Sequence, residues 1–113
     1  MNAYTVKTIL SSCLALLETQ HRPTFLDAKS EQVKYLDLCF HTSVTGYRII
    51  DNAIADCMRD AAQARCWAMY SDSLARAIHI LTVFMVIRDN NPSMRNGTLS
   101  PEQHDQMIFN VIG

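Results

Sequence analysis

The chain has 113 residues, of which 49% are apolar and 19% are charged, and its formal net charge is −1 at pH 7. A chain of this length closes one hydrophobic core without disulfides or a metal, and its high apolar fraction with only three proline and three glycine residues argues against disorder. Ten basic residues are offset by eleven acidic ones, so electrostatic attraction to a polyanion or to a membrane surface is not expected.

The N-terminus and the cysteines bear on the cellular compartment. The first residues lack the basic start, apolar run and small-residue cleavage site of a secretory signal. The four cysteines are too sparse for a disulfide framework, and each lies in a helical pattern where a buried free thiol is ordinary: Cys13, Cys39, Cys57 and Cys66. The sequence therefore predicts reduced thiols in a cytoplasmic protein.

Apolar residues recur at helical spacing nearly throughout, without the alternation typical of strands. The first predicted helix spans 5–20 and ends before Pro23. Its apolar stripe consists of Val6, Ile9, Leu10, Cys13, Leu14 and Leu17. The second predicted helix spans 30–42 and gives way to the glycine-containing stretch 42–46.

The longest helical pattern covers 47–70. Its stripe steps by three and four residues: Ile50, Ile54, Cys57, Ala61, Ala64 and Ala68. The polar run Ser71-Asp72-Ser73 is then predicted to cap a fourth helix over 74–87. That helix is apolar nearly all round and is too short for a membrane span of about 20 residues. We therefore expect it at the centre of the molecule or shared with a second subunit.

The last predicted helix is marked by its first four residues. Residues 88–92 end the preceding helix, and 94–99 read as a loop. Ser100 is an N-cap candidate, Pro101 suits the first helical position, and Gln103 completes a capping box. Over residues 1–113 the sequence thus predicts a single-domain, all-α bundle of four to five helices with a central apolar helix.

The spacing of the chemically reactive residues does not indicate an enzyme or a metal centre. On one continuous helix, Cys57 and Cys66 would lie about 13 Å apart along the axis, too far to share a metal. Asp72 and His79 are separated by about 10 Å, beyond hydrogen-bond reach, whereas Asp72 and Arg76 are spaced for an i,i+4 ion pair. We expect no catalytic residues, cofactor or metal, although a site assembled from several helices stays open as an alternative.

A helix-turn-helix arrangement over 31–51 is the alternative that would bind DNA. Residues 39–42 would form the turn, and 43–51 would form a recognition helix. This helix would offer Ser43, Thr45, Tyr47 and Arg48 to the bases. Gly46 would weaken it by about 1 kcal/mol relative to alanine, and few basic residues lie nearby to contact phosphates. Two core helices with a connection are therefore the favoured interpretation of this stretch.

Residue types that dominate protein interfaces cluster between positions 59 and 70. Trp67 and Tyr70 share a predicted helix face with Gln63, close in sequence to Arg59 and Arg65, although a lone tryptophan is also typical of a core. Surplus apolar surface also favours self-association, a dimer above all. We therefore predict a small cytoplasmic regulator, adaptor, inhibitor or chaperone that is not an enzyme and binds another protein through its helix faces.

Overall fold

The computed structural model describes residues 2–19, 29, 32 and 43–113. This part of the chain contains five helices and no strand, which confirms the predicted all-α bundle. The helices are α1 (Ala3–Thr19), α3 (Arg48–Gln63), α4 (Trp67–Asp89), α5 (Pro92–Asn96) and α6 (Pro101–Ile112). Apart from Gln32, the helix predicted over 30–42 lies outside the described residues.

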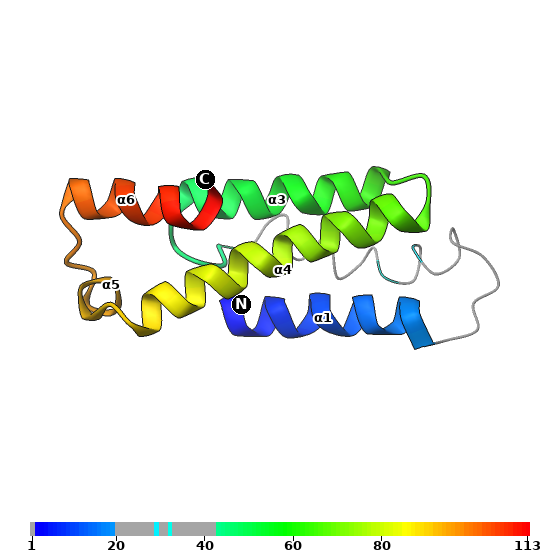
Figure 1. Ribbon diagram of the computed structural model, residues 1–113, viewed down its shortest axis with the longest axis horizontal. Helices are drawn as coiled ribbons and strands as arrows, with labels where there is room; N and C mark the ends of the chain where they lie inside the picture. Colours follow the sequence, from blue (N-terminus) through cyan, green and yellow to red (C-terminus); the bar gives the residue numbers. More distant parts are fainter. Residues whose placement is uncertain (1, 20–28, 30–31, 33–42) are drawn as a thin grey trace.

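Helix α4 is the central element of the bundle. It packs against α1, α3, α5 and α6, and it runs obliquely between α1 on one side and α3 and α6 on the other (Figure 1). Its buried residues fall on one face at helical spacing: Tyr70, Ser73, Leu74, Ala77, Leu81 and Phe84. The prediction of a central apolar helix is confirmed, although Val86 near its C-terminal end is 56% exposed.

Helix α1 forms as its apolar stripe predicts. Asn2 caps it, because its side-chain oxygen accepts a hydrogen bond from the Thr5 amide at 2.8 Å. Val6, Leu10 and Cys13 are buried on the face that packs against α4. This interface covers one side of the central helix.

The continuous helix predicted over 47–70 is wrong, because the chain turns back after Gln63. Ala64 and Cys66 both have extended backbones, with ψ of 141° and 166°. The ammonium of Lys29 donates to the carbonyls of Ala62 and Ala64 at 2.8 and 3.1 Å, which satisfies carbonyl groups that the end of α3 would otherwise leave without partners. The turn also lets α3 and α4 bury their stripes against each other.

The predicted cap at Ser71-Asp72-Ser73 is also wrong, because α4 already begins at Trp67. Ser73 lies inside the helix, where its hydroxyl donates to the carbonyl of Met69 one turn earlier at 3.0 Å. With 23 residues, α4 is the one helix in the described part of the chain that is long and apolar enough to cross a membrane. Length therefore does not exclude a membrane span for α4.

The C-terminal region follows its local signals closely. Ser100 and Gln103 form the predicted capping box, with Ser100 Oγ accepting from the Gln103 amide and Gln103 Oε1 from the Ser100 amide. Residues 94–99 are not wholly a loop, since α5 occupies their first part. Asn91 caps α5, and Gly97, with φ of 70°, ends it in the left-handed conformation.

Candidate partner-binding groove between α3, α4 and α6

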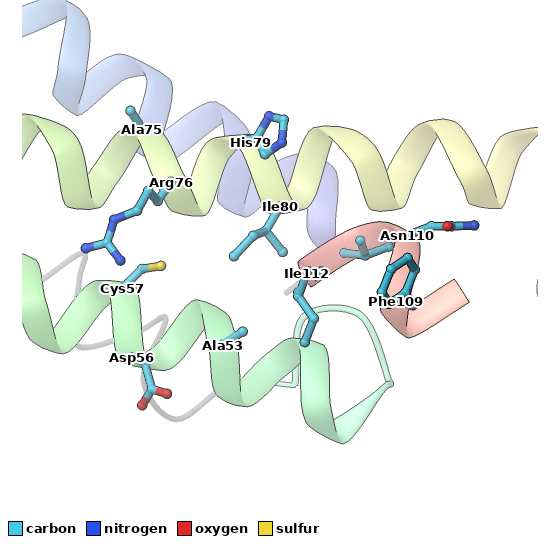
Figure 2. Close-up of a pocket in the computed structure, with 12 residues that line it drawn as sticks. Ala53, Asp56, Cys57, Ala75, Arg76, His79, Ile80, Phe109, Asn110 and Ile112 are labelled. Atoms are coloured by element: carbon cyan, nitrogen blue, oxygen red, sulfur yellow. The ribbon is translucent and has the colours of Figure 1, made fainter. Parts of the chain in front are cut away.

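A groove of about 750 Å³ lies where α3 and the last turn of α6 meet the middle of α4 (Figure 2). It is lined by Ala53, Asp56 and Cys57 of α3, by Ala75, Arg76, His79 and Ile80 of α4, and by residues 109–113 at the end of α6. The antiparallel course of α3 and α4 brings residues from separate parts of the sequence together here.

The deep part of this groove is apolar. Figure 2 shows Ala53 and Cys57 directed from α3 towards α4, and Ile80 directed from α4 towards α3. Cys57 is 4% exposed, and Ile80 is half-buried. Phe109 stands at the rim with 65% of its surface exposed. The small side chains of Ala53 and Cys57 leave room in the groove for an apolar group from outside the chain.

Arg76 reaches across the seam between the two helices. Its Nη2 lies 3.3 Å from Oδ2 of Asp60 on α3, and its Nε lies 3.4 Å from Oδ2 of Asp72 on α4, so the predicted i,i+4 pair forms. The hydrogen bond to Asp60 raises the pKa of the Arg76 guanidinium. All three side chains are at least half exposed, and solvent screening leaves such pairs little net contribution to stability.

A second hollow of about 300 Å³ continues along the same seam beyond Arg76. It is lined by Asp60, Gln63, Met69, Asp72, Ser73 and Arg76. Met69, at its far end, is 52% exposed. Because Arg76 lines both the groove and the second hollow, its side chain separates two parts of one α3–α4 seam.

The thiol of Cys57 belongs to the apolar part of the groove. Burial raises the pKa of Cys57, and nearby carboxylates add to this effect, while the positive charge of Arg76 opposes it. A neutral buried thiol behaves as a small apolar group with low reactivity. Cys57 therefore lines the groove as a small apolar group and not as a nucleophile.

The structure separates the five residues that the sequence grouped as a partner surface. Tyr70 is fully buried and donates a hydrogen bond to Gln32, which corrects its assignment to a surface. Trp67 is half-buried, and its ring meets that of Tyr70 edge-on with centroids 6.5 Å apart. Gln63 is exposed and lines the second hollow.

The two arginines of that group lie on the surface. Arg59 is exposed, with Nη2 2.7 Å from Oδ1 of Asp56 on the same helix. Arg65 is exposed in the turn between α3 and α4. Neither arginine lines the groove or the second hollow.

The recognition helix predicted over 43–51 is wrong in its first half. Helix α3 begins only at Arg48, and Gly46 has a φ of 83°, which a helix does not allow. The hydroxyls of Ser43 and Thr45 donate to Asp51 at 3.1 and 2.8 Å, so they fasten a loop onto α3.

The two other residues of the predicted recognition helix flank the start of α3. Tyr47 is its N-cap residue, and its ring meets that of Phe84 edge-on and lies tilted against that of His104. Arg48 is exposed in the first turn. The predicted turn at 39–42 lies outside the described residues.

The three described cysteines are free thiols. Cys13 and Cys57 are buried, and Cys66 is exposed just before α4. Within the described ranges, no three His, Cys, Asp or Glu side chains come together as they would at a metal site. The chain between Cys57 and Cys66 is not one continuous helix, because α3 ends at Gln63. The axial distance of about 13 Å expected for a continuous helix therefore does not apply.

Sequence reasoning missed the groove because three separate segments build it. The local Asp72–Arg76 pair was predictable from its spacing, whereas the contact of Arg76 with Asp60 depends on the turn after Gln63. Phe109 carried no distinctive signal within its helix. Comparisons with protein-family models, with curated proteins and with solved structures found no match for this chain.

Proposed function

We propose that this chain is a protein-binding module, not an enzyme, that holds one helix of a partner protein in the groove between α3, α4 and α6. The observation that carries the proposal is the combination of an apolar groove with the exposed Phe109 ring at its rim. Aromatic side chains, phenylalanine among them, are enriched at protein–protein interfaces relative to the rest of the surface. Such a module would act as a regulator, adaptor, inhibitor or chaperone.

The shape of the seam favours a helical partner. From Met69 to Ile80 the two hollows follow α4 over eleven residue steps, or about 16 Å, which is the length of about three helical turns. Apolar groups lie at both ends of this path, and polar groups lie between them. An amphipathic helix presents apolar residues at matching intervals, and helix-in-groove docking uses this pattern.

Small side chains also permit a close approach. Ala53 and Ala75 line the groove on its two long sides. Alanine lets helix axes come towards the short end of the range of about 8–10 Å seen for packed helices. A bulkier residue at either position would push a docked helix outwards.

A selection from a displayed library of amphipathic helical peptides tests this function with the full chain as bait. The expected result is a set of peptides that bind the native protein and lose binding to Ala75→Gln, which adds bulk at the edge of the groove without adding charge. Ala68→Gln is the matched control, because Ala68 is also exposed on α4 but lines neither hollow. Peptides that bind both variants equally, or no peptides at all, would contradict the proposal.

The native mass of the protein tests whether a second copy of the chain occupies the groove. A second copy of the chain in the groove would appear as a dimer that Ala75→Gln converts to monomer, while Ala68→Gln would not. That result would replace the partner helix with self-association. A monomer that binds the selected peptides at one-to-one stoichiometry supports the proposal as stated.

A further inference from the structure

The charged groups along the α3–α4 seam are not balanced. Among the described residues, the carboxylates that line the two hollows are those of Asp56, Asp60 and Asp72, and the one guanidinium that lines them is that of Arg76. Arg59 pairs with Asp56 from outside the hollows, which still leaves one negative charge uncompensated. Residues 110–113 also bring the carbonyl end of α6 to the groove, and a helix end of this kind carries partial negative charge. A partner helix placed here meets a negative potential.

Arg76 lies beside two of these three carboxylates. Its guanidinium lies between Asp60 and Asp72, which come from different helices, and it also donates to Ser73 Oγ at 3.3 Å. The side chain is half exposed and separates the groove from the second hollow. It is long and flexible, and its exposed ion pairs hold it weakly, so it swings aside at little cost.

We infer that the partner helix is basic, and that one of its lysine or arginine side chains takes the place of Arg76 between Asp60 and Asp72 in the complex. This inference rests on the proposed function. Arg76 then serves as an internal competitor in the free protein, because it fills the carboxylate pair until the partner arrives. Its displacement joins the two hollows into one path for the docked helix.

Two arginine variants test the displacement with the tightest peptide recovered in the library selection. Arg76→Gln is expected to strengthen its binding about tenfold, because the competing cation is gone. Arg48→Gln is the matched control, since it removes the same charge from an exposed position on α3 that lines neither hollow and contacts none of these carboxylates. The double variant Asp60→Asn with Asp72→Asn is expected to weaken binding, and added salt should weaken it in the native protein.

The composition of the selected peptides provides an independent readout. Lysine and arginine should be enriched, and replacing them by glutamine in the tightest peptide should weaken binding to native protein. Groove-binding peptides that are neutral or acidic would overturn the inference and leave the proposed function standing. Equal strengthening by Arg76→Gln and Arg48→Gln would overturn the displacement of Arg76. A selection without groove-binding peptides would overturn both proposals.

Discussion

The hydroxyl of Tyr70 donates a hydrogen bond to Oε1 of Gln32, a residue 38 positions earlier in the chain. Both side chains are buried, and Nε2 of the same amide donates to the carbonyl of Cys13 in α1 at 3.3 Å. One glutamine side chain therefore links α1 to the central helix α4. Buried polar groups that are satisfied in this way favour one arrangement of the helices over others.

Replacing Tyr70 with phenylalanine should destabilise the fold without affecting the groove. The ring still fits, but Gln32 Oε1 loses its buried donor, which costs about 1–3 kcal/mol of unfolding free energy. Urea unfolding followed by circular dichroism measures the loss. Tyr4→Phe is the control, because Tyr4 is 65% exposed and its replacement should change stability by less than about 0.5 kcal/mol. Equal losses in both variants would contradict the role given to the Gln32 contact.

Lys29→Met should loosen the turn between α3 and α4. Methionine keeps an apolar stem but removes the ammonium that bonds the carbonyls of Ala62 and Ala64, at an expected cost of about 1 kcal/mol. Amide hydrogen exchange should accelerate first in the last turn of α3. Lys7→Met serves as the control, since Lys7 is also half-buried but lies on α1. Uniform acceleration along the whole chain would contradict a local cap.

Asp51 fastens the loop that precedes α3. Its carboxylate accepts from the amides of Val44 and Thr45 at 3.3 and 2.8 Å, and also from two hydroxyls of the same loop. Asp51→Ala should therefore cost about 1.5–3 kcal/mol, the range for hydrogen bonds to a charged group. Thermal unfolding of the two variants measures the loss, and Asp105→Ala, at a side chain that is 86% exposed, should have a much smaller effect. A loss no larger than that of the control would show that the loop does not depend on Asp51.

Features that depend on neighbouring residues were predictable from the sequence. The capping box at Ser100 and Gln103 needs only residues three apart, and it formed as predicted. The stripe of α1 likewise reflects helical spacing alone, and Val6 and Leu10 are buried. Local geometry determines both outcomes, so a single sequence is sufficient for them.

Features that depend on distant residues were not predictable. The apolar stripe continues through Ala64 without interruption, yet the chain turns there and Lys29, far away in sequence, satisfies the carbonyls. Tyr70 resembles an interface residue by type, but its partner Gln32 lies on another part of the chain. The groove was not predicted for the same reason, because helix periodicity does not indicate which helices become neighbours.

Stability should fall as the pH rises through the alkaline range. Burial raises the pKa of Cys13 and of Cys57, so the unfolded chain releases these thiol protons at a lower pH than the folded chain does. The folded state then binds more protons, and the unfolding free energy decreases with pH. This contribution is complete below the ordinary thiol pKa of about 8.5 and is lost progressively above it. Burial also raises the pKa of Tyr70, which extends the decrease in stability above about pH 10.

Urea unfolding at a series of pH values measures how steeply the unfolding free energy falls with pH. The double variant Cys13→Ala with Cys57→Ala should be less stable at neutral pH, because it leaves two small cavities, but its stability should change less between neutral pH and about pH 9.5. An unchanged slope in that variant would assign the alkaline loss to other groups.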